Sequence, residues 1–308
     1  MHRRSLLAAT FALACFGGLL AAAPAAADFH REQKLALAPG GELLVDAAGG
    51  SVTVTGGAAD GATVVITSTR DDVEERYRFE LTSEPGRVRV ISRRRGTGWS
   101  KWFDWSSSGS LHFDVRVPRE TRVDLKSSGG GIHVSGLTGN AKVRSSGGGL
   151  DIADIAGNVD AGSSGGGVEL KQVRGNVDVS SSGGGVDVAQ VTGAVTASSS
   201  GGGVHVDGAG GRVMAESSGG PVSAVLAAGN SAGGSLSSSG GSVRVAIARD
   251  ARLSIDASSS GGSVSCELPV QSLGKQSRNA LRGDLNGGGP VLKLRSSGGG
   301  IQIDGSGD

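Results

Sequence analysis

The sequence predicts an all-β protein that folds as a parallel β-solenoid, and three observations lead to this fold class. Gly-Gly-Gly recurs every 18 residues, beginning at residues 129, 147, 165, 183 and 201. Each triplet is followed by an apolar, a variable and a second apolar residue, which is the period-two pattern of a short strand with one buried face. Glycine supplies 56 of the 308 residues, and no aromatic residue follows Phe113, so the interior is expected to be narrow.

The first 27 residues are predicted to be a signal peptide. A basic start at residues 1–4 precedes an apolar stretch over residues 5–23, and residues 25–27 are the small residues of a cleavage site. We therefore expect an exported protein of the periplasm or cell surface, whose mature chain has no membrane-spanning segment. Cys15 offers an alternative, a lipid-anchored form, but Ala12 stands where a lipoprotein signal prefers Leu.

The charge of the chain is nearly balanced. Cleavage after residue 27 leaves 28 basic and 29 acidic side chains, a net charge of −1. Nucleic acid is therefore not an expected partner, because its binding depends on positive charge. Cleavage also leaves Cys266 as the only thiol, so no disulfide within the chain is expected.

Residues 28–118 are predicted to form an N-terminal β region that includes the first coil and caps the solenoid. Residues 49–54 already resemble one coil. Residues 77–80 and 87–91 alternate across residues 83–86, which predicts a β-hairpin. Residues 110–117 and 121–127 then lead into the repeats across Pro118. The bulkier region would cover the end of the stack, because an uncapped edge invites association.

Residues 119–308 are predicted to be Gly-rich solenoid repeats with coils of 18–21 residues. A second strand is expected at residues 141–143, 159–161 and 177–179, each preceded by a Gly-Asn turn. The first apolar column contains Ile132, Leu150, Val168, Val186, Val204, Val222, Val243, Val264 and Ile301. The second column, two places later, contains Val134, Ile152, Leu170, Val188, Val206, Ala224, Val245, Cys266 and Ile303.

Stacking of the coils explains how such short strands become buried. Coils about 4.8 Å apart bury a continuous apolar column that one coil cannot bury alone. The general preference for right-handed crossovers favours a right-handed winding. The glycine triplets are interpreted as tight corners whose backbone angles other residues resist, and the Ser pairs before them as stacked hydroxyl ladders.

The coil pattern and the lead-in at residues 115–118 resemble the putative adhesin family of exported bacterial β-helical domains. The resemblance covers roughly residues 35–304. The matching residues are corners and core, so the likeness is specific for architecture and weak for activity. It implies a non-enzymatic protein of the cell envelope, and some members of this largely uncharacterised family look connected with envelope-stress systems.

One outward row of the repeats carries titratable side chains. If the coils are in register, the row contains His133, Asp151, Glu169, Asp187 and His205. Carboxylates at this spacing resemble the acid pairs of glycosidases, and with imidazoles they could hold a divalent cation. A solvated face is the simpler interpretation, because the apolar columns oblige the intervening residues to face solvent. We therefore predict no catalytic residue and no metal site, and we expect Cys266 to be a buried, inert thiol.

The predicted binding residues precede the repeats. All three Trp lie within seven residues, shortly after three consecutive Arg. Such a loop would bury its rings at a lipid interface while the Arg side chains meet anionic head groups, or it would stack on a glycan or a partner protein. The alternative is that the rings fold back and cap the solenoid. The residues are Trp99, Trp102, Phe103, Trp105, Arg93, Arg94 and Arg95.

Taken together, these features predict an exported, adhesin-like structural or binding module of the cell envelope without catalytic activity or cofactor. Its expected partners are an envelope glycan, a lipid surface or an envelope protein. One alternative is a β-helical enzyme that acts on polysaccharide. The other is a peripheral membrane-binding component of envelope stress that uses the Trp/Arg loop.

Overall fold

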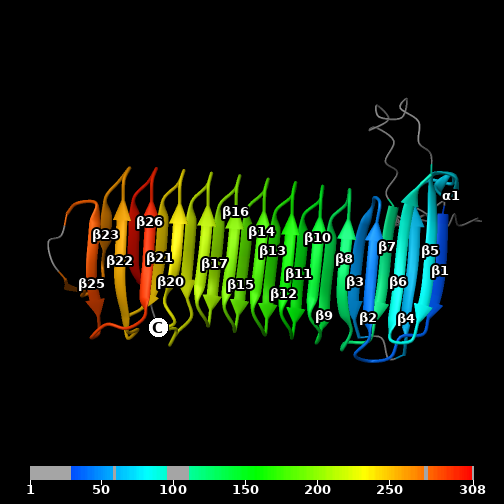
Figure 1. Ribbon diagram of the computed structural model, residues 1–308, viewed down its shortest axis with the longest axis horizontal. Helices are drawn as coiled ribbons and strands as arrows, with labels where there is room; N and C mark the ends of the chain where they lie inside the picture. The colour runs from blue at the N-terminus through cyan, green and yellow to red at the C-terminus, as the bar shows by residue number, and fades with distance from the viewer. Residues whose placement is uncertain (1–28, 58–59, 96–110, 274–276, 307–308) are drawn as a thin grey trace, which may run out of the picture.

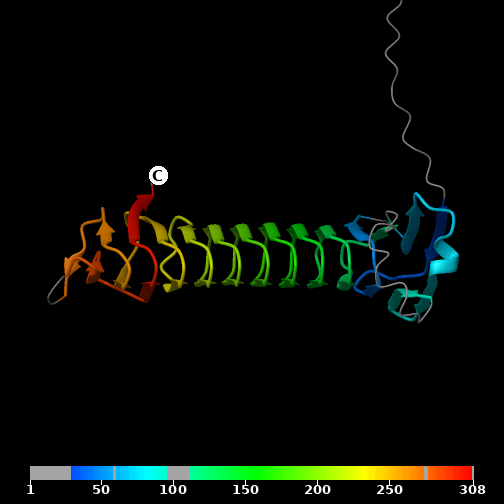
Figure 2. The same ribbon diagram turned by 90° about the horizontal axis from the view of Figure 1, so that it is seen from above.

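The computed structural model describes residues 29–57, 60–95, 111–273 and 277–306. The protein is a long rod whose strands lie across its long axis (Figure 1). A 13-stranded sheet (sheet A) and a 14-stranded sheet (sheet B) face each other along the rod, as the view from above shows (Figure 2). In the described part of the chain the one helix is the short α1 (Val73–Arg76). The predicted all-β solenoid is confirmed.

Each regular coil contributes one strand to each sheet. Neighbouring coils pair in parallel and in register, so that Leu150 lies opposite Val168 and Val168 opposite Val186. Sheet A receives β9 (Ile132–Leu137), β11 (Leu150–Ile155), β13 (Val168–Val173), β15 (Val186–Val191), β17 (Val204–Ala209), β19 (Val222–Leu226) and β21 (Val243–Ala248). Sheet B receives β10 (Ala141–Ser145), β12 (Val159–Ser163), β14 (Val177–Ser181), β16 (Val195–Ser199), β18 (Val213–Ser217) and β20 (Gly234–Ser238).

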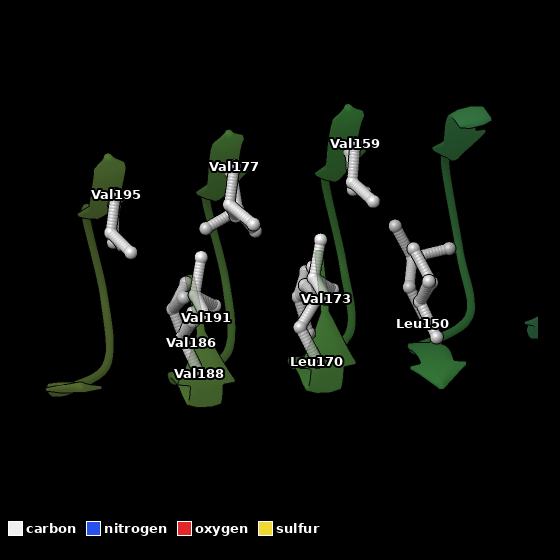
Figure 3. Close-up of a cluster of buried hydrophobic side chains, with 14 of the residues drawn as sticks. Leu150, Val159, Leu170, Val173, Val177, Val186, Val188, Val191 and Val195 are labelled. Atoms are coloured by element: carbon white, nitrogen blue, oxygen red, sulfur yellow. The ribbon is translucent and has the colours of Figure 1, made fainter. Parts of the chain in front are cut away.

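The core is a narrow apolar layer between the two sheets. Val188 is 0% exposed, whereas its neighbour Asp187 is exposed, so the predicted inward and outward positions are confirmed there. Figure 3 shows Val177 of sheet B pointing toward Val186 and Val191 of sheet A. Burial of each such side chain contributes about 1.5–3 kcal/mol, and the stack gains stability by repeating it.

The glycine triplets allow the coils to approach each other closely. A Cβ atom on Gly148 would lie 2.2 Å from the backbone nitrogen of Gly131 in the preceding coil, and one on Gly166 would lie 2.4 Å from that of Gly149. None of the glycines in the five triplets from residue 129 to residue 203 has a left-handed φ. The expectation that these corners need special backbone angles is therefore wrong. Glycine is required there because a side chain would clash with the backbone of the neighbouring coil.

Left-handed φ values occur at another repeated position. The residue before the last one in each of five sheet A strands has φ between 51° and 73°. The resulting bulge skips one residue of the ladder, so that Ile155 pairs with Val173 and both turn back into the core. The five residues are Gly136, Asp154, Gln172, Gln190 and Gly208.

A column of buried serines joins the coils at the glycine corner. The Ser145 hydroxyl donates to the Gly130 carbonyl of the preceding coil and accepts from the Gly148 N–H, both at 3.0 Å. One serine of each pair therefore stacks in register from coil to coil, as predicted, and its hydroxyl bonds glycine backbone. The column contains Ser127, Ser145, Ser163, Ser181, Ser199, Ser217, Ser238, Ser259 and Ser296.

The N-terminal region continues the same two sheets. The strands are β1 (Phe29–Leu35), β2 (Glu42–Ala47), β3 (Ser51–Gly56), β4 (Ala62–Ser68), β5 (Tyr77–Glu84), β6 (Arg87–Arg94), β7 (Leu111–Val117) and β8 (Arg122–Ser127). β3 pairs in parallel with β9, which confirms a coil near residues 49–54, and β5 and β6 form the predicted hairpin. One continuous core cluster runs through this region and the repeats, and the proposed boundary at residue 118 stays a prediction.

Antiparallel strands and aromatic rings close the N-terminal end. β4 pairs antiparallel with β1 and β7, and β5 forms the edge of sheet B. The ring of Phe79 lies 6.0 Å from that of Phe29, 6.3 Å from that of Tyr77 and 6.1 Å from that of Phe113, measured between centroids. These four rings supply bulk that the coils lack.

The spatial order of the coils departs from chain order at both ends. The β2–β3 coil lies between β6–β7 and β8–β9. At the other end, β26 (Val291–Ser296) and β27 (Ile301–Ser306) lie between the β20–β21 coil and the coil of β22 (Leu253–Ser259) and β23 (Val264–Cys266), as Figure 1 shows for β26. β25 (Ala280–Leu285) and β24 (Gln271–Ser272) then extend sheet B antiparallel.

Candidate binding surfaces

The predicted Arg and Trp residues are only partly within the described residues. Trp99, Trp102, Phe103 and Trp105 lie outside them. Arg93 and Arg94 end β6, and Arg95 follows directly. All three Arg are exposed at the N-terminal end of the rod.

Contacts hold all three arginines against the N-terminal cap, two through their side chains and Arg95 through its backbone. Arg93 Nη2 lies 3.1 Å from Asp46 Oδ2, although 61% of the Arg93 side chain remains exposed. The Arg94 guanidinium lies 5.9 Å from the centroid of the Tyr77 ring, a cation–π contact. Arg95 donates its backbone N–H to the Arg76 carbonyl at 2.7 Å. This end of the rod therefore presents guanidinium groups held partly by an aromatic ring.

A further ion pair stabilises the turn before β5. The guanidinium groups of Arg70 and Arg76 each place Nε 2.7 Å from a carboxylate oxygen of Asp72. Their hydrogen bonds hold the pKa of Asp72 well below its usual range. Asp72 therefore stays ionised at neutral pH and balances part of the positive charge at this end.

The outward row on sheet A has the predicted register. Asp151 lies opposite His133 and Glu169, and Asp187 lies opposite Glu169 and His205. The row is divided into local contacts rather than one cluster.

Those contacts join a side chain of the row either to the next side chain in the row or to a nearby residue of the same strand. His133 Nδ1 lies 3.0 Å from Asp151 Oδ2, and His205 Nδ1 lies 2.7 Å from Ser223 Oγ. Lys171 pairs with Glu169, whose hydrogen bond and charge raise the pKa of Lys171. In residues 29–57, 60–95, 111–273 and 277–306, no three His, Cys, Asp or Glu side chains are arranged to hold a metal ion.

A small polar hollow of about 390 Å³ lies on sheet A near the N-terminal end. Sequence analysis missed it because its residues come from four strands, β1, β4, β7 and β3, which join through two antiparallel pairings and one parallel pairing outside the regular repeat. The lining residues are Glu32, Thr53, Thr55, Thr63, Val65, Asp114, Val115 and Arg116.

A larger groove of about 590 Å³ follows the outer surface of sheet B. It crosses β2, β8, β10, β12, β14 and β16, which are neighbours in the sheet. An asparagine ladder runs along it: Asn140 Oδ1 accepts the Asn158 N–H, Asn158 Oδ1 accepts the Asn176 N–H, and Asn176 Oδ1 accepts the Ala194 N–H, each at 2.9 Å. The Gly-Asn pairs in the sequence were the signal for this ladder, but they predict only a turn.

The Cys266 thiol is half-buried, and the expectation of full burial is wrong. β23 is the last strand of sheet A, so no further coil covers this residue. Burial raises the pKa of the Cys266 thiol, and the S–H group points to the Leu268 carbonyl at 3.7 Å. The thiol is therefore protonated and weakly reactive at neutral pH.

Comparisons with known proteins give a family match and distant structural similarities. The family model described as Toastrack DUF4097 matches residues 41–304. No curated protein matches the chain. No helix within the described ranges has the length and apolar character needed to cross a membrane.

The solved structures that are similar to the chain include three bacterial proteins. A putative adhesin from Bacteroides fragilis NCTC 9343 is 13% identical, with 89% of this chain and 96% of that chain covered and a TM-score of 0.43. A putative lipid binding protein from Parabacteroides distasonis ATCC 8503 is 10% identical, with the same coverage and a TM-score of 0.40. A putative cell adhesion protein from Clostridium sporogenes ATCC 15579 is 12% identical, with 90% and 100% covered and a TM-score of 0.26.

Proposed function

The chain belongs to the Toastrack DUF4097 family, and from this premise we propose that it is an exported, non-catalytic structural and binding module of the cell envelope. The observation that carries the proposal is the use of its polar groups. The nine buried serines bond glycine backbone, and the asparagine ladder bonds backbone N–H groups. These buried hydroxyls and ladder amides hold the rod together, which supports a structural role for them.

A catalytic alternative rests on Asp187, His205 and Ser223, which lie in one row. In a serine hydrolase one ring nitrogen of the histidine faces the serine and Nδ1 faces the carboxylate. Here Nδ1 of His205 faces Ser223 Oγ at 2.7 Å, and the contact lies on the exposed face of sheet A. This geometry favours a surface hydrogen bond over catalysis. The test is whether the purified protein hydrolyses a carboxylic ester. Hydrolysis that is lost in the Ser223→Ala variant would contradict the non-catalytic proposal.

We place the main contact region at the N-terminal end of the rod, at Arg93, Arg94 and Arg95 and the Trp-containing segment that follows. Exposed guanidinium groups at this end support the placement, as does the concentration of all three Trp within seven residues. Arg and Trp side chains suit contacts with anionic head groups and the membrane interface, with glycans, or with a protein partner.

The test replaces Trp99, Trp102 and Trp105 together by Ala. Loss of binding to anionic lipid vesicles or to isolated cell envelopes is expected, with the melting temperature almost unchanged. If the rings instead form part of the cap, the variant should melt markedly earlier, because truncation of each buried aromatic costs about 3–5 kcal/mol. A matched triple Arg→Ala control at the exposed Arg174, Arg212 and Arg252 should bind like the native protein, whereas the same change at residues 93–95 should weaken binding.

Export has its own test. Cell fractionation and the mass of the mature N-terminus should show cleavage after Ala27 and recovery from the periplasm or cell surface. A mature chain that begins at a lipid-modified Cys15 would replace soluble export by lipid anchoring. Recovery of the uncleaved chain from the cytoplasm would contradict the envelope proposal.

A further inference from the structure

We propose that the groove on sheet B binds an uncharged, linear β-1,4-linked polysaccharide whose chain runs along the rod. The groove runs from β2 onto the repeats, and its lining does not include Arg93, Arg94 or Arg95, so this site is separate from the contact region proposed above. The inference rests on four properties of the groove, which are its direction, its donors, its acceptors and its charge.

The direction of the groove favours an extended polymer. It crosses six neighbouring strands, from β2 to β16, and therefore runs along the long axis of the rod. Six strands at about 4.8 Å spacing make it roughly 24 Å long. With a volume of about 590 Å³ over that length it is narrow and open, which suits a chain rather than a compact small molecule.

The asparagine ladder supplies a periodic row of donors. Each Oδ1 of Asn140, Asn158 and Asn176 accepts a backbone N–H, which fixes the orientation of the amide. The NH2 group of each exposed side chain is then the free part of the amide, and none of the hydrogen bonds formed among the described residues uses it. Equivalent donors therefore recur in the three successive coils that contain Asn140, Asn158 and Asn176, and the row ends at Ala194.

A second row of outward positions has the same register, and it offers acceptors at Asp124, Asp160, Asp178 and Thr196, whereas Lys142 only donates. The residues of this row lie opposite one another on successive strands, and they are Asp124, Lys142, Asp160, Asp178 and Thr196. The last four each follow by two places the residue of the asparagine row in the same coil, which is Asn140, Asn158, Asn176 or Ala194. Asp124 Oδ1 is buried and has no hydrogen-bond partner, although a buried polar atom normally has one. Because that oxygen is shielded from solvent, a hydroxyl-rich ligand would donate instead to the exposed Asp178 carboxylate and Thr196 hydroxyl, while its other hydroxyls accept from the amides.

The charge of the groove argues against a polyanion. Its lining contains four carboxylates and two cations, and Arg87 and Arg144 pair with two of the carboxylates, Glu42 and Asp160. The balance is then neutral, which gives no attraction for nucleic acid or a phosphate polymer. An uncharged chain avoids both repulsion and the cost of burying an unpaired charge.

The spacing of the groove distinguishes a glycan from a peptide. An extended peptide advances about 3.3 Å per residue and would lose register with donors spaced about 4.8 Å apart. The backbone groups of sheet B already pair with each other along the rod, so they cannot form a ladder with a peptide laid across them. A β-1,4-linked pyranose chain advances per sugar by nearly the coil spacing, so three successive sugars would stay in step with the amides of Asn140, Asn158 and Asn176.

The experiment measures binding of cello-, xylo-, manno- and chito-oligosaccharides from two to eight sugars by calorimetry. For at least one series we expect affinity to rise with length and to level off near the five or six sugars that the groove spans, about 24 Å. No binding by any of the four series, or an affinity independent of length, would overturn the proposal. Preferential binding of an extended peptide or of heparin at the groove would also overturn it.

The decisive variant is Asn158→Asp with Asn176→Asp. A carboxylate keeps an oxygen that accepts the backbone N–H, so the ladder and the melting temperature should persist, while both NH2 donors are lost. Affinity for the hexasaccharide should fall about tenfold or more. The matched control, Gln172→Glu with Gln190→Glu, makes the same chemical change at exposed positions of sheet A and should leave binding unchanged.

The experiments test the groove independently of the contact region proposed at the N-terminal end. The triple Trp→Ala variant should keep its affinity for the hexasaccharide, and the Asn158→Asp, Asn176→Asp variant should keep its binding to vesicles and envelopes. Loss of hexasaccharide binding in the Trp variant, with native affinity in the double Asp variant, would move the glycan site to the N-terminal tip and overturn the groove.

Discussion

The regular coils and the two ends of the rod share one pair of sheets but are stabilised in different ways. From β8 to β21 the strands pair in parallel with their equivalents in the neighbouring coils, and the same inward positions repeat. At the N-terminal end, antiparallel strands and four aromatic rings replace this repetition. At the other end, β25 and β24 extend only sheet B, and sheet A stops at the three-residue β23.

The difference shows how a repetitive protein handles its exposed edges. A coil in the middle of the stack satisfies its backbone groups through its two neighbours, but an end coil has one neighbour fewer. β1, the edge strand of sheet A, alternates exposed charged residues such as Glu32 and Lys34 with half-buried ones, and β23 is very short. Both devices discourage pairing with a strand from another molecule.

The largest expected effect breaks a column in the coils. Val188→Asp should destabilise the protein by about 5 kcal/mol or more, because it places a carboxylate without a partner in a fully buried position. Thermal and urea melts would measure the loss. Asp187→Val, one residue away and outward, should change stability by less than about 0.5 kcal/mol. Equal losses in the two variants would contradict the assignment of inner and outer faces.

The next effect concerns the aromatic cap. Phe113→Ala should cost about 3–5 kcal/mol, because Phe113 is 1% exposed and contacts the ring of Phe79. Hydrogen exchange should locate the loss at the N-terminal strands and leave β13 to β17 protected. A loss of protection spread evenly along the rod would mean that the cap and the coils unfold as one unit.

A smaller loss is expected from the serine column. Ser181→Ala should cost about 1–3 kcal/mol, because it leaves the Gly166 carbonyl and the Gly184 N–H without the hydroxyl that bonds both. Ser182→Ala is the matched control, since Ser182 is the exposed residue of the same pair. If both variants melt like the native protein, the column contributes nothing measurable.

The smallest effect tests how the coil at the far end is held. Arg295 Nη2 lies 2.8 Å from Asp256 Oδ2, and this hydrogen bond lowers the pKa of Asp256 below its ordinary value. A lowered folded-state pKa means that this stability is present above the unfolded-state pKa and is lost as pH falls through the lowered value. Stability at the far end should therefore fall below about pH 4, by no more than about 1 kcal/mol for this partly screened pair.

Urea melts at pH 3 and pH 6 would measure this pH dependence. Asp256→Asn should reduce the difference between the two pH values, whereas Asp187→Asn should not. An unchanged difference in Asp256→Asn would assign the acid sensitivity to other carboxylates.

The sequence allowed the coils to be predicted in detail, because each coil repeats its own local signal. Alternation at positions such as Val186 and Val188 marked the buried face, and the 18-residue step set the register. The reason for the glycines was misjudged, because a sequence does not show that Gly148 approaches Gly131. The order of the coils at the ends could not be foreseen, since β26–β27 resembles any other coil and its place depends on contacts far away in the chain.

The candidate surfaces were harder to predict than the fold. The row from His133 to His205 follows from the register, but its contacts depend on side-chain rotamers. The groove and the polar hollow combine residues from several strands, so no short motif marks them. The Trp segment was found from composition alone and stays a prediction, because it lies outside the described residues.

The insertion of the β26–β27 coil between two earlier coils affects how the rod carries mechanical load. β26 is hydrogen-bonded to β20 and β22, and β27 to β21 and β23. A pull on the segment after Ser306 must therefore break ladders on both sides of the coil at once. A terminal coil placed in chain order would instead unzip one ladder at a time. The β26–β27 coil is held by a neighbouring coil on each side, so the far end of the rod should resist a pulling force better than the short edge strand β23 suggests.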